Sequence, residues 1–321
     1  MSESQRWILA KNDADTIVFK EAVQKALIHR GVSDFLGLRD LVFFWGVVFL
    51  SYAVLVASNF YWGACLIAFV LVAKAQNGLL LSGHEAVHKL LFRNLKLNDF
   101  SGQYLCFAPF GVGFYRARLS HIDHHHYLLS TRDEKLDQQL DFPGFGSFLK
   151  HVMAPLFGSY LVKFVGRFLG MKTKRRAQPE FTYPPKLVRA DMWAICMTQL
   201  LFFIGLTLVD WRLYPFFWAL PIVTLSAMLH NAKGFLDHLR WPNETEGMLY
   251  SYRPGRVDRI FFGIQQMNHA EHHLFPYIPY YRLGHLSESV DRLSMVRRRD
   301  GYFRSLLRFG RTMITPPRSQ V

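Results

Sequence analysis

Apolar residues are concentrated in four stretches of the chain. Residues 41–57 and 60–81 are separated only by Ser58 and Asn59, and residues 192–209 and 216–229 are joined by a short connection. A helix needs about 20 mainly apolar residues to cross the hydrocarbon core of a bilayer. The pattern therefore predicts an all-α integral membrane protein with four transmembrane helices, paired as two hairpins over about 41–81 and 192–229.

Two further apolar stretches do not read as spans. Residues 104–114 are too short, and residues 152–169 are interrupted by Pro155, Lys163 and Arg167. We expect both to lie at the membrane surface. Within the second span, Lys74, Gln76 and Asn77 are expected to face the interior of the helical bundle, because a polar group in hydrocarbon is costly.

Basic residues set the expected orientation. The chain has 38 Lys and Arg against 24 Asp and Glu, and most of them lie outside the hairpins, including the run Arg297–Arg299. Lys and Arg are enriched on the cytosolic side of membrane proteins. This predicts cytosolic segments at 1–40, 82–191 and 230–321, with both termini cytosolic and residues 1–321 forming one domain.

The same bias explains the net charge of +14 without a nucleic-acid partner. The basic surface suits anionic lipid headgroups or an acidic electron carrier docking at Arg297–Arg299.

No cleaved export signal is predicted, because the first twenty residues mix charges. A bacterial inner membrane and the endoplasmic reticulum are both consistent with this. Cys65, Cys106 and Cys196 are predicted to be buried free thiols.

Histidine carries the candidate chemistry. Nine of the 14 histidines fall in three short groups. These are His84 and His88 in HEAVH, His121, His124, His125 and His126 in HIDHHH, and His269, His272 and His273 in HAEHH.

The spacing of these groups predicts metal binding. Histidines three or four residues apart share one face of a helix, and imidazole is a suitable ligand for iron, zinc or copper. All three groups belong to predicted cytosolic segments, and at least eight candidate ligands are too many for one ion, so we expect two ions. His238, at the end of the fourth span, is a ninth expected ligand.

Other polar residues near the ligands are expected either to contact imidazoles or to be exposed to solvent. Glu85, Asp123 and Glu271 lie inside the three groups, where a carboxylate can orient a ligand through its second ring nitrogen. His126 does not fit the ligand spacing and is expected either beside the ligands or in solvent. In the segment after the second group, Asp133, Glu134 and Asp137 are expected either to form a polar surface or to pair with basic residues.

Two rival classes also fit part of the pattern. HEAVH satisfies the HExxH motif of zinc proteases, with Glu85 as general base, but that interpretation leaves the other two groups unexplained. A metal transporter or sensor would place ligands inside the spans, which are nearly free of histidine.

The phrases GHEAVHKLLFRNLKLND, SHIDHHHYLLSTRDEKLD and MNHAEHHLFPYIPYYRLGHL resemble the three histidine boxes of the membrane fatty acid desaturase family. The resemblance covers about residues 41–286. It implies four spans under a cytosolic helical cap, a di-iron centre that uses O2, and an acyl tunnel. The implied ligands are the eight histidines of the boxes together with His238, and Asn268 is implied to lie beside them.

The resemblance implies an oxidoreductase of lipid metabolism but not one reaction. A desaturase acting on the acyl chain of a lipid or acyl thioester is expected first. A hydroxylase or ketolase acting on another lipid, such as a sphingolipid or carotenoid, is the alternative. Electrons are expected from a separate ferredoxin or from cytochrome b5 with its reductase.

Overall fold

The computed structural model describes residues 13–128, 133, 144–160, 162, 183–238, 241, 248–261 and 267–314. Among them, four helices are long and apolar enough to cross a membrane. They are α3 (Asp34–Ala57), α4 (Trp62–Val87), α9 (Pro185–Val209) and the continuous helix Leu213–His238, whose last part is α10 (Ala227–His238). The prediction of four candidate spans is confirmed. The two-hairpin arrangement and the cytosolic cap stay predictions.

Each helix extends beyond the apolar stretch that predicted it. α3 begins seven residues early, where Ser33 caps it by accepting a hydrogen bond from the Leu36 amide. Its first turns contain the adjacent ion pair of Arg39 and Asp40. Polar residues that hydrogen-bond or pair with one another at a helix end lengthen the helix without lengthening its apolar stretch. Hydropathy alone therefore underestimates the lengths of these helices.

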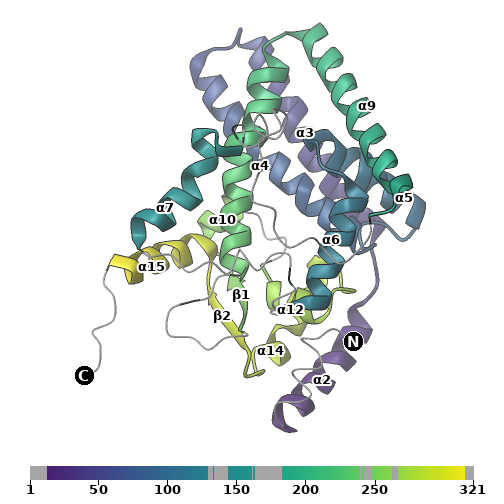
Figure 1. Ribbon diagram of the computed structural model, residues 1–321, viewed down its shortest axis with the longest axis vertical. Helices are drawn as coiled ribbons and strands as arrows, with labels where there is room; N and C mark the ends of the chain where they lie inside the picture. The colour runs from purple at the N-terminus through teal and green to yellow at the C-terminus, as the bar shows by residue number, and fades with distance from the viewer. Residues whose placement is uncertain are drawn as a thin grey trace. The chain divides into compact units, whose positions relative to one another are not determined.

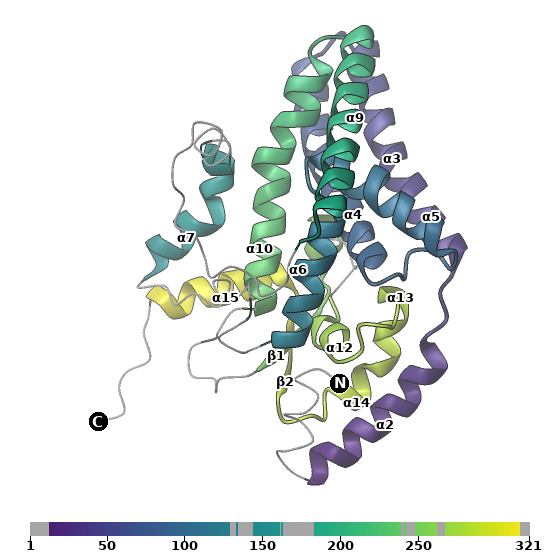
Figure 2. The same cartoon turned by 45° about the vertical axis from the view of Figure 1, so that its right-hand side comes forward.

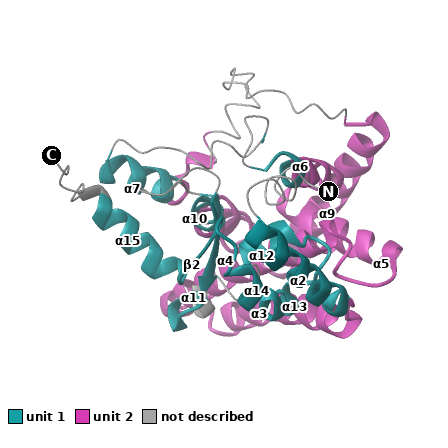
Figure 3. Ribbon diagram, turned by 90° about the horizontal axis from the view of Figure 1, so that it is seen from below, with its two compact units in different colours: residues 1–30, 124–154, 230–321 teal, residues 31–123, 155–229 magenta. Residues whose placement is uncertain are grey.

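The chain forms two compact units, coloured separately in Figure 3. Unit 2 comprises residues 31–123 and 155–229, and unit 1 comprises residues 1–30, 124–154 and 230–321.

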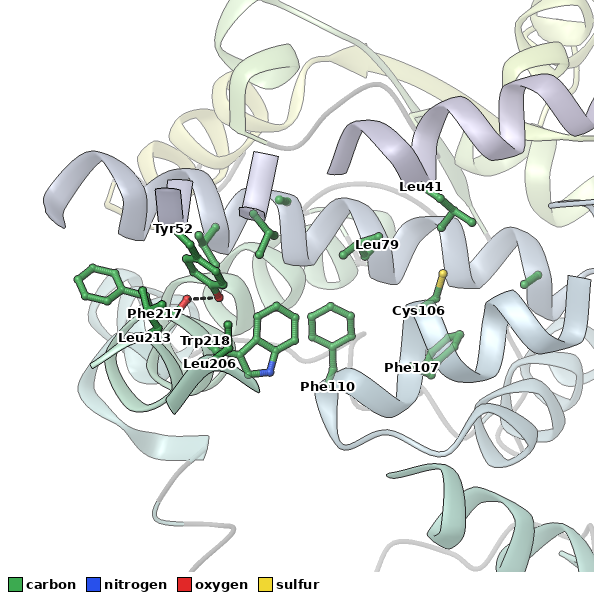
Figure 4. Close-up of a cluster of buried hydrophobic side chains, with 14 of the residues drawn as sticks. Leu41, Tyr52, Leu79, Cys106, Phe107, Phe110, Leu206, Leu213, Phe217 and Trp218 are labelled. Carbon is green, nitrogen blue, oxygen red and sulfur yellow. Dashed lines mark hydrogen bonds between the residues drawn. The ribbon is translucent and has the colours of Figure 1, made fainter. Parts of the chain in front are cut away.

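The core of unit 2 is aromatic and aliphatic, and Figure 4 shows part of it around Trp218. Two hydrogen bonds connect its helices, from Tyr52 Oη to the Phe217 carbonyl and from Gln76 Nε2 to the Trp218 carbonyl. Gln76 and Asn77 are buried and Lys74 is half-buried. The expectation that this polar group faces protein is therefore confirmed for Gln76 and Asn77.

Residues 104–114 differ from expectation. They belong to a π-helical turn, η1 (Ser101–Phe107), a 3-10 turn, η2 (Ala108–Phe110), and the start of α6 (Phe114–Tyr127). Cys106 and Phe110 are buried in the core of unit 2 (Figure 4), and so is Phe114. The segment was predicted to lie at the membrane surface, but its apolar side chains fill space between protein helices instead.

The fourth candidate span is not a regular α-helix. It begins with two π-helical stretches, η5 (Leu213–Ala219) and η6 (Ile222–Ser226). Pro215 lies in the first, and Pro221 directly precedes the second. Proline cannot donate the usual backbone hydrogen bond, and a widened turn accommodates its ring without breaking the helix.

Unit 1 contains shorter helices around a two-stranded parallel sheet, an exception to the all-α prediction. β1 (Leu249–Arg253) pairs with β2 (Val296–Asp300). The helices are α2 (Asp13–His29), α7 (Phe145–Met153), most of α10, α11 (Arg256–Phe261), α12 (His269–Leu274), α13 (Tyr280–Leu283), α14 (Ser287–Val290) and α15 (Tyr302–Ile314). α2 packs against α14 (Figure 2) and α15 against α7 (Figure 1).

The three cysteines are free, but only one fits the prediction of buried thiols. Cys106 is buried, Cys65 is intermediate and Cys196 is exposed. Cys196 lies on the exposed face of α9, where an apolar sequence context reflects a candidate membrane span and not a protein core.

A carboxylate from α9 caps the N-terminus of α6. Asp191 accepts hydrogen bonds from the amides of Tyr115 and Arg116, at 3.1 and 3.0 Å, and from the hydroxyl of Tyr183. These amides have no partner inside α6, and the positive end of the helix dipole favours the negative charge. A Cβ on Gly113 would lie 2.4 Å from an Asp191 carboxylate oxygen. The cap therefore requires glycine at that position.

We predict that Asp191→Ala lowers the thermal unfolding midpoint of the detergent-solubilised protein by roughly 5 °C, the consequence of losing a helix cap worth about 1–2 kcal/mol. Asp210→Ala, at the other end of α9, is the control, because it removes a partly exposed ion pair with Arg212. Fluorescence-detected size exclusion after heating measures both. Equal shifts in the two variants would contradict the capping role.

Candidate metal centre

The first histidine pair lies where α4 ends. His84 occupies the last turn of the helix and His88 is its C-cap residue. Lys89 then turns the chain with a φ of +63°. The rings of His84 and His88 lie 4.9 Å apart, centroid to centroid. The prediction that both residues share one face at the end of the second span is confirmed.

His121 on α6 completes a three-histidine group in unit 2. Its Nε2 atom lies 2.8 Å from Nε2 of His84, and its ring centroid lies 4.9 Å from that of His88. Each of the three residues offers a ring nitrogen within 4.8 Å of the others. Two sequence segments that are more than 30 residues apart thus place three imidazoles together.

Arg118 joins α6 to the end of α4 one turn before His121. Its guanidinium donates to the carbonyls of Ala86 and Val87, at 2.8 and 3.2 Å, and forms a two-pronged ion pair with Asp99. Asn98 supports the same turn, because its side chain accepts from the Leu91 amide and donates to the Ala86 carbonyl. Neither Arg118 nor Asn98 was predicted from the sequence to position the histidines.

Unit 1 gathers six histidines. They are His124 and His125 from the last turn of α6, His238 at the end of α10, and His269, His272 and His273 from α12. Ring nitrogens of His124, His238 and His273 lie within 4.8 Å of one another. His238, predicted only as an additional ligand, is therefore adjacent to members of the second and third groups.

The contacts among these rings suit a metal site. Nε2 of His269 lies 2.9 Å from Nε2 of His273 and 3.3 Å from Nε2 of His238. Nε2 of His125 lies 3.0 Å from Nε2 of His272. Two nitrogens bound about 2.1 Å from one ion lie about 3.0–3.4 Å apart at right-angled to tetrahedral geometry. One neutral nitrogen is a poor partner for two others at once, so a shared cation explains the convergence on His269 better than hydrogen bonding.

The electrostatics of unit 1 keep His273 neutral. Burial holds the pKa of His273 well below its usual value, and the neighbouring His269, His125, His124 and His238 lower it further. A protonated ring would lose hydration and meet other cations. Neutral imidazole is the form that binds metal, so the cluster is prepared for a cation.

Asp133 orients His124. Its Oδ1 atom lies 2.7 Å from Nδ1 of His124, and both side chains are buried. A carboxylate on the second nitrogen fixes the ring and directs Nε2 toward a metal. The sequence prediction of a surface position for Asp133 is wrong. The prediction for Glu134 and Asp137 lies outside the described residues.

Asp237 plays a related part and was not predicted. Its carboxylate lies 3.7 Å from Nδ1 of His269, forms an ion pair with buried Lys233, and accepts a hydrogen bond of 2.7 Å from the Tyr302 hydroxyl. The only sequence signal was its place directly before His238. Lys233 is one turn earlier on α10, where its charge balances the buried carboxylate.

The carboxylates inside the first two boxes and His126 have different surroundings. Glu85 is buried, with Oε1 3.8 Å from Nδ1 of His84, so it lies beside a candidate ligand as expected. Asp123 is partly exposed. His126 is exposed and packs edge-on against Tyr127, which corresponds to the solvent alternative of its prediction.

Glu271 and Asn268 belong to a network with β2. Glu271 is fully buried and accepts from Ser251, Ser287 and Arg298. The Asn268 side chain accepts from Arg298 at 3.2 Å. This network ties α12, which carries three histidines, to both strands. Glu271 thus anchors the helix that presents the ligands.

The run Arg297–Arg299 is not the uniform basic surface that the sequence indicated. Arg298 is inserted between Glu271 and Asp291, with its side chain 9% exposed. The Arg299 guanidinium lies over the Trp241 ring at 3.9 Å. Only Arg297 is exposed. Docking of an acidic carrier therefore cannot be assigned to this run as a whole.

We predict that Asp133→Asn weakens metal binding by about 10- to 100-fold, because His124 loses the carboxylate that orients it. His126→Ala, on the exposed side of the same helix, should leave binding unchanged. Metal content after titration with a chelator measures both variants. Undiminished metal retention in Asp133→Asn would exclude the orienting role.

Arg118→Met should also weaken metal binding, by about tenfold or more, because it keeps much of the side-chain length but removes the contacts that hold α6 to the end of α4. Arg116→Met on the same helix is the control, because Arg116 is exposed. The same chelator titration applies. A loss of binding of equal size in both variants would argue against a specific contribution from Arg118.

Comparison with known proteins agrees with this geometry. The family model described as fatty acid desaturase matches residues 59–304. This range contains the three candidate ligands of unit 2 and the six of unit 1. A search of curated proteins found no match. The match covers more than half of the chain, and the chain therefore belongs to the membrane fatty acid desaturase family, a family of oxidoreductases.

Proposed function

We propose that this protein is an O2-dependent di-iron desaturase that introduces a double bond into the acyl chain of a lipid or acyl thioester. The observation that carries the proposal is the convergence of imidazole Nε2 atoms at ligand-like separations, formed by the family's histidine boxes and His238. In this proposal His84, His88 and His121, together with the six histidines of unit 1, bind two iron ions.

The donor set fits iron. All nine candidate ligands are imidazoles, and imidazole binds iron, zinc and copper. Iron, when bound, supplies the one-electron chemistry that activates O2. Zinc has no redox chemistry, which disfavours it for a member of an oxidoreductase family. A desaturase reaction balances when the substrate gives two hydrogens, an external donor gives two electrons, two protons are taken up and O2 leaves as two waters.

The residues of the chain would contribute binding and orientation. Burial and the neighbouring imidazoles keep His273 neutral. Asp133 would hold the His124 ring in a fixed orientation through a hydrogen bond, and the Asp237 carboxylate, 3.7 Å from Nδ1 of His269, would attract that ring electrostatically. Small positional errors at a reacting carbon can slow a reaction greatly. We further propose that the four candidate spans form two hairpins below a cytosolic cap, that both termini are cytosolic, and that ferredoxin or cytochrome b5 with its reductase supplies electrons.

The zinc protease alternative is not supported by the surroundings of Glu85. A protease would use this carboxylate as a general base on a metal-bound water. Glu85 is buried beside His84, and six further histidines gather in unit 1, which a single zinc site with three protein ligands does not need.

We predict that the purified protein binds about two iron ions per chain, and that His124→Ala and His272→Ala each lose iron and activity while remaining inserted in the membrane. His126→Ala is the matched control for loss of a histidine. Elemental analysis and membrane fractionation measure the two properties. Full activity in either ligand variant would refute the assignment.

Mass spectrometry of lipids from a host that expresses the protein tests the reaction itself. New double bonds in acyl chains, absent in a host expressing His124→Ala, are the expected result. A new hydroxyl or ketone on another lipid would replace the desaturase proposal with a hydroxylase or ketolase of the same family.

A further inference from the structure

Helix α15 has two different faces. Tyr302, Ser305 and Phe309 are buried on one. The opposite face carries the exposed side chains Phe303, Arg304, Leu307, Arg308 and Arg311. At 100° per residue these five positions lie within about 140° of arc. Within this arc Phe303 and Leu307 lie on one side and Arg311, Arg304 and Arg308 on the other, so one exposed surface presents an apolar strip beside a basic strip.

Helix α7 extends this surface. Gly310 of α15 packs against Phe145 at the start of α7, and Phe309 contacts Phe148 edge-on at 4.9 Å. While Phe148 is buried, the adjacent Leu149 and Lys150 are exposed. We call the outward side of the two helices the α7–α15 face. Its residues are Leu149, Lys150, Phe303, Arg304, Leu307, Arg308 and Arg311.

Contacts with α10 fix where these helices lie along the chain's fourth candidate span. Asn231 Nδ2 donates to the His151 carbonyl at 3.0 Å, and the Phe235 ring contacts those of Phe148 and Phe309 at 5.4 and 5.6 Å. The helix of this span ends at His238, but its apolar stretch ends at Leu229. At 1.5 Å per residue, Asn231 and Phe235 lie about 3 and 9 Å beyond the end of the apolar stretch. Helices packed there are at the depth of the boundary between acyl chains and headgroups.

The charge of the α7–α15 face is strongly positive. It carries Lys150, Arg304, Arg308 and Arg311, and the Asp300 carboxylate lies 3.5 Å from Arg308. Both of these side chains are about half exposed, so the pair neutralises little. Phe303, Leu307 and Leu149 are 46, 51 and 44% exposed beside these cations. An acidic protein would match the charges but not the apolar side chains beside them.

We propose that the α7–α15 face binds the surface of a bilayer that contains anionic phospholipid, with Leu149, Phe303 and Leu307 inserted among the upper acyl carbons and the basic side chains paired with lipid phosphates. Basic residues beside apolar ones on an in-plane helix are the pattern of such binding. The proposal does not depend on iron, on the substrate or on the reaction.

Fluorescence in lipid nanodiscs tests this binding. The full chain carries Cys65→Ser and Cys196→Ser, and Leu307→Cys is labelled with bimane. Nanodiscs contain phosphatidylcholine alone or with phosphatidylglycerol, together with lipids that carry a quencher near the headgroup. We expect strong quenching of the label at position 307, greater in the anionic discs. A label at Glu288→Cys, where the charged side chain is 88% exposed, is the aqueous control.

Charge reversal tests the recognition of anionic lipid. Arg304→Glu with Arg308→Glu should reduce the preference for phosphatidylglycerol over phosphatidylcholine by about tenfold or more. Lys20→Glu with Arg297→Glu changes the net charge equally at exposed positions elsewhere in unit 1 and should preserve it.

Three results would overturn the proposal. A label at position 307 that is quenched no more than the one at Glu288→Cys would place the face in water. Equal quenching in neutral and anionic discs would remove the charge recognition. Protection of the label only in discs that hold two protein copies would identify a second copy of the chain as the partner.

Discussion

Burial of neutral imidazoles is the constraint on which the rest of this structure depends. A histidine in water titrates near neutral pH and keeps its hydration, whereas six histidines packed together in unit 1 must give up both. The hydrogen bond between His124 and Asp133 offsets part of the free energy of this desolvation, and in the proposed function binding of the ring nitrogens to cations offsets more. The Asp237 carboxylate lies 3.7 Å from Nδ1 of His269 and adds an electrostatic attraction, while Lys233 and Tyr302 in turn pair with Asp237.

The polar residues around the histidines form successive supports. Arg118 and Asn98 hold the end of α4, Asp191 holds the start of α6, and Glu271 with Arg298 holds α12. Each contact satisfies a backbone group or a buried charge that the ligand-bearing helix would otherwise leave uncompensated. The same groups that stabilise the helices therefore determine where the imidazoles point. In such a site, stability and ligand geometry cannot be optimised separately.

The sequence was sufficient for the features that depend on local periodicity. Hydropathy located four candidate spans, and histidine spacing identified the grouped histidines that meet in each unit. His238 was predicted from its place at the end of the fourth span. The sequence did not predict the surroundings of a residue whose interaction partner lies on a distant segment, or whose burial differs from what its polar character suggests. Nothing local distinguishes buried Arg298 from exposed Arg297, because the difference lies in Glu271 on another element. Asp133 resembles its acidic neighbours, and only its contact with His124 sets it apart. The pairing of β1 with β2 likewise joins segments more than 40 residues apart.

Helix α4 is both a candidate membrane span and the carrier of two ligands. It runs without interruption from Trp62 to Val87, with His84 in its last turn. A helix transmits axial displacement almost rigidly, and a span adjusts its depth or tilt when hydrophobic length and bilayer thickness differ. Fluidity and thickness of a membrane depend on the unsaturation of its lipids. In the proposed function, the position of His84 would therefore depend on the bilayer thickness that the enzyme's own product changes, and the membrane would act physically on its own remodelling.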